Sequence, residues 1–299
     1  MNFRQDRLAE NVANHAMDLI DRFGDRPFFL FLHFYDPHWH YAPPPEMMKK
    51  FETSYSGTIT GNLKDFQKLT PGDVKPPDLD HLLALYDGEI RYTDDQIARF
   101  MAHLKERTIL RNTMVLVTSD HGEEFLEHGS WEHQKTLYEE VIRIPLMVSA
   151  PGLKPRSESR PVSLLDVAPT LLDFAGVALA PGMKGVSLMR PVPEVREMYG
   201  ETDNTLDGSR LAFLRGGAQS WKAILRSDAT KAKVKSAEWY DLTVDAKEMV
   251  NAPPADSLRE SIEGRVKGIA LASRSKLPVN KVALTPEQIE QLRSNGYVK

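Results

Sequence analysis

The sequence has no cysteine, no long apolar run and no strong charge of either sign. Without cysteine the chain cannot form disulfide bonds, an absence that is compatible with any compartment. No stretch approaches the roughly 18 consecutive apolar residues that indicate a transmembrane helix. The first residues lack the apolar region of a signal peptide, so we expect none in this chain, and its localisation stays open. A net charge of −4 gives no electrostatic reason to expect nucleic acid as a partner.

What the sequence does contain is ordinary for a globular protein. Hydrophobic residues make up 41% and charged residues 27% of the 299 positions, which are typical values. A chain of this length can bury the core of one large domain, or of one large and one small domain. Short strand-like runs between polar turns begin near residue 196, so we expect an α/β domain at 1–195 and a C-terminal α+β subdomain at 196–299.

Helices and strands alternate in the first part of the chain. Apolar residues at helical spacing predict helices, and continuous β-branched and aliphatic runs predict buried strands. The predicted helices span 5–23, 81–107 and 164–174, and the predicted strands 27–34, 113–118 and 144–148. Ser163 can cap the third of these helices, and Thr285 with Pro286 can begin a last helix over 284–296. The alternation predicts an α/β fold with a mostly parallel sheet flanked by helices.

Residues suited to chemistry gather directly after the predicted strand at 113–118. Asp120 and His121 follow this strand, with Gly122 and Glu123 next to them. Ligands of open α/β sheets bind at the carboxyl ends of the strands, and an adjacent carboxylate and imidazole suit a metal ion. A glycine beside them lets the backbone turn sharply. The alternative is a simple turn in which Asp120 caps the next element.

Several blocks of the sequence, in one order, resemble the sulfatase family of the alkaline phosphatase superfamily. The blocks are 27–38 with 41–44, 86–97, 112–123, 127–129, 136–146, 239–242 and 284–298. An ordered series of this kind is far more specific than one short motif. The resemblance implies an alkaline phosphatase-like fold, incomplete in this chain, with a small antiparallel sheet and a terminal helix at its C-terminal end.

The family's nucleophile is not found in this sequence. Sulfatases carry an early Asp-Asp metal pair and then Cys or Ser followed by x-Pro-x-Arg, whose Cys or Ser is oxidised to formylglycine. The chain has no cysteine and no Ser-x-Pro-x-Arg string. Its first recognisable block, at Pro27, belongs to the middle of the family. The resemblance therefore implies the C-terminal portion of a sulfatase without its nucleophile half, and we expect this chain alone to be inactive.

The resemblance also implies roles for individual residues. Asp120 and His121 match the family's second pair of metal ligands, and the ion is usually calcium. Manganese or zinc is the alternative, because an Asp-His pair is common in relatives that hold those metals and calcium prefers oxygen ligands. His38 matches the histidine that touches the sulfate ester, with His40 as the nearest competitor. His33, inside the apolar strand, is expected to be a core histidine with a satisfied hydrogen bond.

One further catalytic position is ambiguous. The family often places lysine where this chain has His133, and Lys135 lies two positions further on. A protonated histidine or a lysine would do similar electrostatic work on a developing anion. We therefore take His133 as the preferred residue and Lys135 as the alternative.

Other polar residues are expected to be structural. His128 could orient the loop, and Arg143 could pair with a glutamate at 139 or 140. Asp94 and Asp95 lie in the middle of a predicted helix, where adjacent positions do not face each other. We therefore do not assign them to a metal.

The activity implied by the resemblance is metal-dependent hydrolysis of a small-molecule, carbohydrate or aryl sulfate ester. A hydrated formylglycine from the missing half would attack sulfur, and His38 would protonate or hold the bridging oxygen. Two alternatives stay open: a phosphodiesterase or phosphonate monoester hydrolase of the same superfamily, and a non-catalytic binding module with a sulfatase fold. An incomplete sheet would have an unpaired edge, so we expect this chain to oligomerise or aggregate.

Overall fold

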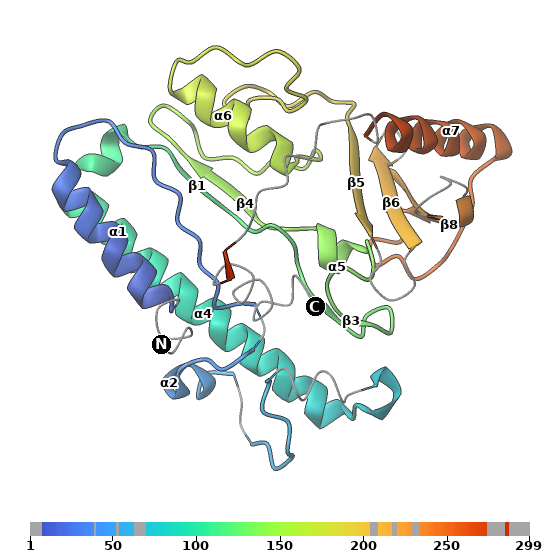
Figure 1. Ribbon diagram of the computed structural model, residues 1–299, viewed down its shortest axis with the longest axis horizontal. Coiled ribbons are helices and arrows are strands. Elements are labelled where there is room, and N and C mark those ends of the chain that lie inside the picture. The colour runs from blue at the N-terminus through green and yellow to red at the C-terminus, as the bar shows by residue number, and fades with distance from the viewer. Residues whose placement is uncertain are drawn as a thin grey trace.

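The computed structural model describes most of the chain. The described residues are 8–38, 40–51, 54–62, 70–203, 209–216, 220–228, 234–273 and 285–286. Two long helices, α1 (Ala9–Phe23) and α4 (Pro76–Glu106), lie side by side along one flank of the molecule (Figure 1). The C-terminal sheet and helix lie on the opposite flank, with the strands that carry the candidate site between the two.

Helix α1 packs on α4 through small residues. Ala9, Ala13, Ala16 and Ile20 are its buried positions, and their spacing of three and four places them on one face. Small side chains on that face let the two backbones approach closely. The helix ends at Gly24, whose φ of 58° lies in the left-handed region that glycine adopts without strain. Both long helices were predicted from apolar spacing, and both predictions are confirmed.

Strand β1 (Val115–Thr118) pairs with β4 (Leu146–Ser149). Their register, from Val115 opposite Ser149 to Thr118 opposite Leu146, is antiparallel. Every strand pair in the described parts of the chain is antiparallel, so the mostly parallel sheet is not confirmed. The predicted strand at 27–34 is extended but belongs to no described strand pair. Apolar runs indicate burial of a strand, but they do not specify the direction of its partner.

The loop between β1 and β4 folds onto helix α4. It contains β2 (Glu124–Phe125), β3 (Trp131–Glu132) and the short helix α5 (Glu139–Ile142). A hydrophobic cluster joins this loop to α4 and to the segment after residues 27–34. Its buried members are Tyr41, Leu82, Leu85, Phe125 and Trp131. Burial of these aromatic and aliphatic side chains fixes the loop against the helix.

The C-terminal part is an antiparallel sheet covered by one helix. Its strands are β5 (Glu197–Asp203), β6 (Ser209–Gly216), β7 (Trp221–Asp228) and β8 (Val234–Asp241), in that order, and the helix is α7 (Asp256–Ser273). Buried Leu214, Leu225 and Trp239 of the sheet pack against Val266 of the helix. The antiparallel C-terminal sheet is therefore confirmed. Of the predicted last helix at 284–296, only Thr285 and Pro286 are among the described residues.

Shorter elements complete the structure. They are α2 (Pro45–Met48), the 3-10 helices η2 (Pro71–Asp73), η3 (Ile109–Asn112) and η4 (Leu164–Asp166), and α6 (Val167–Phe174). The Ser163 hydroxyl accepts a hydrogen bond from the Leu165 backbone N–H, which confirms the predicted cap. Among the described residues, no helix combines the length and apolar character needed to cross a membrane.

One face of the segment at 27–34 is open to solvent. Phe29 and Phe31 are 74% and 77% exposed, and His33 follows them on the same alternating face. The prediction of a core histidine at His33 is wrong, because this face of the extended segment is uncovered. The ring of His33 instead meets Tyr35 edge-on at 5.9 Å.

Candidate active site

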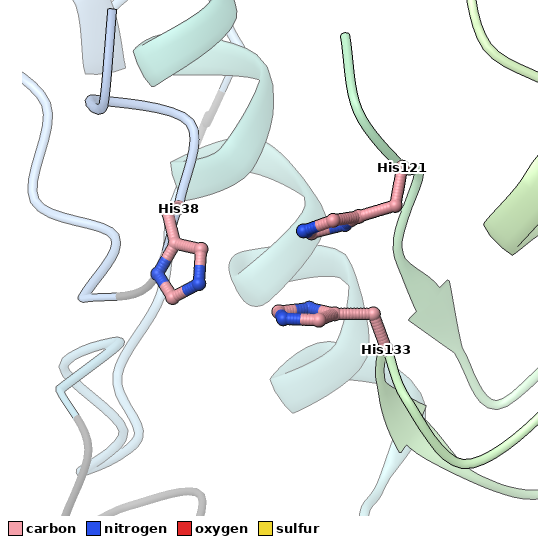
Figure 2. A group of neighbouring side chains, drawn as sticks. All are labelled: His38, His121 and His133. Atoms are coloured by element: carbon pink, nitrogen blue, oxygen red, sulfur yellow. The ribbon is translucent and has the colours of Figure 1, made fainter. Parts of the chain in front are cut away.

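Three histidines from separate parts of the sequence converge at one place (Figure 2). His38 comes from the turn after the segment at 27–34, His121 lies in the loop between β1 and β2, and His133 follows β3. Their ring centroids are 3.8 Å apart for His121 and His133, 5.1 Å for His38 and His133, and 6.3 Å for His38 and His121. One ring nitrogen from each lies within 4.8 Å of the others.

The orientation of His121 is set by its own backbone. Its Nδ1 lies 2.8 Å from the carbonyl oxygen of Gly122. Because a carbonyl oxygen only accepts hydrogen bonds, Nδ1 is the donor in this contact. Asp120 Oδ2 lies 3.8 Å from Nε2. The carboxylate and the imidazole thus lie beside each other, and their role as metal ligands stays a prediction.

The orientation of His133 is set by a buried carboxylate. His133 Nδ1 lies 3.0 Å from Glu123 Oε1, and both side chains are buried. The other oxygen of Glu123 accepts a 2.7 Å hydrogen bond from the Tyr41 hydroxyl. Burial, followed by the nearby Glu123 carboxylate, raises the pKa of Tyr41 well above its ordinary value, so the phenol stays a donor. Glu123 is therefore held from both sides and orients the His133 ring.

Gly122 is needed for a close approach between two backbone segments. The N–H groups of Gly122 and Glu123 donate to the carbonyls of Val141 and Glu140, at 2.7 and 3.1 Å. A Cβ atom at position 122 would collide with the carbonyl oxygen of Glu140. The sequence suggested that this glycine allows a sharp turn, but the structure shows close packing of the loop on α5 as the reason.

The backbone around His133 is strained. Glu132 and Gln134, on either side of it, have φ values of 65° and 68°, a region that costs non-glycine residues about 1–2 kcal/mol each. Such conformations persist where the surrounding structure holds them, and they cluster at functional sites. Here the two residues turn the chain so that His133 points toward His38 and His121.

Contacts with Tyr35 and with the start of helix α1 hold the turn that carries His38. Its ring stacks on Tyr35 with the centroids 4.7 Å apart, and its backbone N–H donates to the Tyr35 carbonyl at 3.0 Å. In the same turn, Asp36 Oδ1 accepts a 2.9 Å hydrogen bond from the backbone N–H of Ala9, at the start of α1. The turn that carries His38 is thereby tied to the first helix.

The structure does not bring every candidate residue into this group. His40 is exposed, and Lys135 Nζ pairs with Glu132 Oε2 at 2.7 Å. Asp95 pairs with Arg91 on the surface of α4 at 2.6 Å, a contact that fits the structural role predicted for it. His128 is bound on both ring nitrogens, 2.6 Å from Glu140 Oε1 and 3.1 Å from the Glu248 carbonyl.

The predicted ion pair of Arg143 is wrong. Arg143 is exposed, whereas Glu139 pairs with Arg215 and Lys222 of the C-terminal sheet, at 3.0 and 3.2 Å. Glu140 is taken by His128. These partners are distant in sequence, so local helical spacing could not reveal them.

Sequence reasoning also missed Glu123 and Tyr41 as supports of the site. Glu123 adjoins the Asp120–His121 pair, which is a signal that could have been used. Tyr41 lies 82 positions from Glu123, and no local pattern indicates their contact.

Chemically, the arrangement offers imidazole nitrogens, one exposed carboxylate and a buried carboxylate that orients a ring. A metal-binding histidine usually donates its second N–H to a carboxylate or a backbone carbonyl. His121 and His133 both have such a partner. The donor set therefore fits a divalent metal ion.

Sequence comparison identifies relatives of this chain among known proteins. The sequence pattern of the sulfatase family matches residues 4–177. Arylsulfatase K of Canis lupus familiaris is 30% identical over 227 residues, which cover 72% of this chain and 39% of that protein. The chain thus spans about two-fifths of the length of this relative.

Solved structures share the fold at lower identity. BT4656, in complex with its substrate D-glucosamine-2-N,6-O-disulfate, superposes with a TM-score of 0.67 and 20% identity, covering 92% of this chain and 71% of the other. Phosphonate monoester hydrolase of Agrobacterium radiobacter gives a TM-score of 0.66 and 19% identity, covering 94% and 64%. The family match covers more than half of the chain. This protein belongs to the sulfatase family, within the alkaline phosphatase superfamily.

Proposed function

We propose that this chain supplies one half of an active site for the metal-dependent hydrolysis of sulfate esters. The observation that carries the proposal is the convergence of His38, His121 and His133 beside Asp120, from loops that are far apart in sequence. Family membership and the sulfatase relatives support this class of reaction. The nucleophile is assigned to a segment outside this sequence, which contains no cysteine.

In this proposal Asp120 and His121 are the metal ligands. The carboxylate of Asp120 is 74% exposed and lies 3.8 Å from Nε2 of His121, so both can turn toward one ion. The bound ion would stabilise negative charge on the transferring group. Calcium is the family's usual ion, and manganese or zinc would suit the imidazole better.

His38 and His133 act on the ester. His38 lies on a turn across from His121 (Figure 2), where it can donate a proton to the bridging oxygen as the leaving group departs. His133 donates to a sulfate oxygen, with its ring fixed by Glu123. We prefer His133 over Lys135 for this role, because the Lys135 ammonium is paired with Glu132.

The substrate class within the superfamily is part of the proposal. Sulfate and phosphate esters have similar shapes, and the scaffold does not separate them. The relatives' names favour a sulfate ester, and phosphonate or phosphate ester hydrolysis is the alternative outcome of the test below. A third outcome is a binding module that has the fold without the chemistry.

The test begins with the coding sequence upstream of Met1. We expect it to encode, in frame, Cys or Ser followed by x-Pro-x-Arg. The longer polypeptide, produced in cells that form formylglycine, should hydrolyse 4-nitrophenyl sulfate faster than phenyl 4-nitrophenyl phosphonate. His38→Ala and Asp120→Asn should abolish the reaction, whereas His15→Ala, on the exposed face of α1, should not.

Three results would contradict the proposal. An upstream sequence without such a motif would remove the nucleophile that the mechanism needs. A higher kcat/KM for the phosphonate would change the substrate class. Metal-dependent turnover of 4-nitrophenyl sulfate by the present chain alone, lost in His38→Ala, would place the nucleophile within these 299 residues.

A further inference from the structure

The C-terminal sheet packs directly on the His133 loop (residues 128–138) and on helix α5, which follows it. A hydrophobic cluster joins loop and sheet, and its buried members are Leu137, Ile224 and Tyr240. Helix α5 lies beside this sheet in Figure 1. The Tyr138 hydroxyl adds a hydrogen bond to Glu238 Oε2, at 2.7 Å. The proposed function uses none of these contacts.

Glu248 joins the two parts through buried polar contacts. Its side chain is fully buried, and Oε2 accepts a 2.6 Å hydrogen bond from the backbone N–H of Glu139, the first residue of α5. Its Oε1 lies 2.6 Å from Nζ of Lys222, whose side chain is also fully buried. Its carbonyl oxygen lies 3.1 Å from Nε2 of His128. One residue of the C-terminal part thus holds the chain on both sides of His133.

We propose that Glu248 is a positioning residue that holds the His133 loop and helix α5 in place behind the candidate active site. The proposal rests on the proposed function and deepens it, because it concerns the geometry of the same site. Glu248 acts through Glu139 and His128 rather than on the ester. The C-terminal part of the chain then contributes to turnover as well as to stability.

The first support is that the beginning of α5 depends on Glu248. Tyr138 occupies the N-cap position and provides no side-chain hydrogen bond to the helix. The first N–H groups of any helix have no partner within it, and leaving such a group unpaired away from water is costly. The Glu248 carboxylate supplies the acceptor from 109 positions further along the chain. Loss of this carboxylate should therefore loosen the first turn of α5.

The second support is that α5 backs the segment with the predicted metal ligands. Backbone carbonyls of α5 accept hydrogen bonds from the N–H groups of Gly122 and Glu123, at 2.7 and 3.1 Å. Glu123 in turn orients the His133 ring. A shift of α5 would therefore displace His121 and His133 together. A misplacement of about 1 Å costs an enzyme on the order of 100-fold in rate.

The third support is the conformation of Glu248 itself. Its φ of 55° lies in the left-handed region, which is strained for a residue other than glycine and is frequent at functional sites. Asp245 fixes this turn, because its carboxylate accepts hydrogen bonds from the N–H groups of Met249 and Val250, at 3.1 and 2.8 Å. Burial raises the pKa of Glu248, and the Lys222 ammonium opposes this rise. The turn is thus built to present an ionised carboxylate to α5.

The contact with His128 adds a second link. Nδ1 of His128 lies 2.6 Å from Glu140 Oε1, and Nε2 lies 3.1 Å from the Glu248 carbonyl. A carboxylate and a carbonyl both accept hydrogen bonds, so a ring with a proton on each nitrogen donates to both. Tyr138 stacks on this ring with the centroids 3.7 Å apart. The ring therefore ties α5 to the Glu248 turn.

The first test measures amide hydrogen exchange on the purified 299-residue chain. In Glu248→Ala, the amides of Gly122 and Glu123 should exchange on the order of 10-fold faster, because the carbonyls that they bind belong to α5. His128→Gln removes the second link and should accelerate the same amides. Amides of helix α1, on the opposite flank, should exchange as in wild type.

Matched controls separate positioning from general destabilisation. Glu248→Gln keeps an oxygen for the N–H of Glu139 and should stay within about threefold of wild type. Glu197→Ala removes a glutamate of the same sheet, where it pairs with Arg265, and should change nothing. In Glu248→Ala, Lys222 keeps the Glu139 carboxylate as a partner at 3.2 Å, so the buried ammonium stays compensated.

The second test measures turnover by the longer polypeptide, produced in cells that form formylglycine. Glu248→Ala should lower kcat for 4-nitrophenyl sulfate by about 10-fold to 100-fold and leave KM within about twofold, because the reacting groups lose their alignment. Glu248→Gln should recover most of the lost kcat, and Glu197→Ala should match wild type.

Three results would overturn the proposal. Equal exchange of the Gly122 and Glu123 amides in wild type and Glu248→Ala would show that α5 does not depend on Glu248. Equal acceleration throughout the chain, helix α1 included, would reduce Glu248 to a support of overall stability. Faster exchange at the site with unchanged kcat would remove the role in turnover.

The exchange test needs no ester, so its outcome is separate from that of the proposed function. A longer polypeptide that prefers phenyl 4-nitrophenyl phosphonate would contradict the proposed substrate class. The role of Glu248 would then be supported by the same loss of kcat with the phosphonate, and overturned by an unchanged kcat.

Discussion

The buried Asp166 should be one of the most sensitive positions for stability. It lies at the junction of η4 and α6, and its side chain is 0% exposed. One oxygen accepts from the Ser163 backbone N–H at 2.9 Å and the other from Val186 at 2.8 Å. Arg196 donates to both oxygens at 2.8 Å. The carboxylate therefore ties the loops around α6 to the start of β5.

Replacing Asp166 by asparagine keeps the volume and removes the charge. The amide group cannot accept hydrogen bonds at both positions, and Arg196 loses its anionic partner in a buried setting. Removing one member of a buried ion pair costs about 3–5 kcal/mol, a large share of the roughly 5–15 kcal/mol that stabilises a typical domain. We expect Asp166→Asn to lower the free energy of unfolding by this amount.

Asp173→Asn is the matched control. Asp173 makes the same two-point contact with Arg190, at 3.1 and 3.0 Å, but Arg190 is 74% exposed. Water replaces such a surface contact at little cost. Urea unfolding followed by circular dichroism should show a large fall in the midpoint for Asp166→Asn and almost none for Asp173→Asn. Equal midpoints for the two variants would refute the reasoning from burial.

The pH dependence provides a second measure of the same contact. Burial by itself raises the pKa of Asp166, but Arg196 and the backbone N–H groups outweigh it and hold the pKa below its ordinary value of 3.8. A carboxyl with a lowered pKa in the folded state stabilises the protein above its unfolded pKa, and this contribution is lost as the pH falls through the folded value. Asp166→Asn should therefore reduce the acid sensitivity of the unfolding midpoint.

Two further predictions follow from the structure. Burial opposes protonation of His128, but its hydrogen bond and ion pair with Glu140 outweigh this and raise the pKa of His128 above 6.5. The contact should therefore stabilise the folded protein fully below pH 6.5, and this stabilisation should be lost as the pH rises through the pKa of His128 in the folded state. Urea midpoints measured across this range should fall more steeply for wild type than for His128→Gln, and parallel profiles would contradict the role of Glu140. The open face with Phe29 and Phe31, 74% and 77% exposed, should promote self-association. Light scattering after size exclusion should show concentration-dependent oligomers that diminish in Phe29→Ser/Phe31→Ser, and a monodisperse wild-type monomer would exclude this.

The sequence was most informative where structure depends on local patterns. The apolar spacing over 81–107 located helix α4, and Ser163 located the start of η4, because spacing and capping are properties of neighbouring residues. The pair Asp120–His121 was singled out from neighbouring residues together with the family resemblance, and its metal-binding role stays a prediction.

Features that depend on distant partners were missed or mistaken. The direction of the β1–β4 pairing, the exposure of His33 and the contact of Tyr41 with Glu123 are all decided by segments far apart in the chain. An apolar run shows that a strand can be buried, but it does not show what covers it. The partly buried Glu139–Lys222 contact likewise joins positions 83 residues apart.

The most direct test of the account is the activity of the longer polypeptide, produced in cells that form formylglycine. Wild type should hydrolyse 4-nitrophenyl sulfate only when a divalent metal ion is present, and both His38→Ala and Asp120→Asn should abolish this turnover. Turnover that survives in both variants would contradict the claim that His38 and Asp120 belong to the active site.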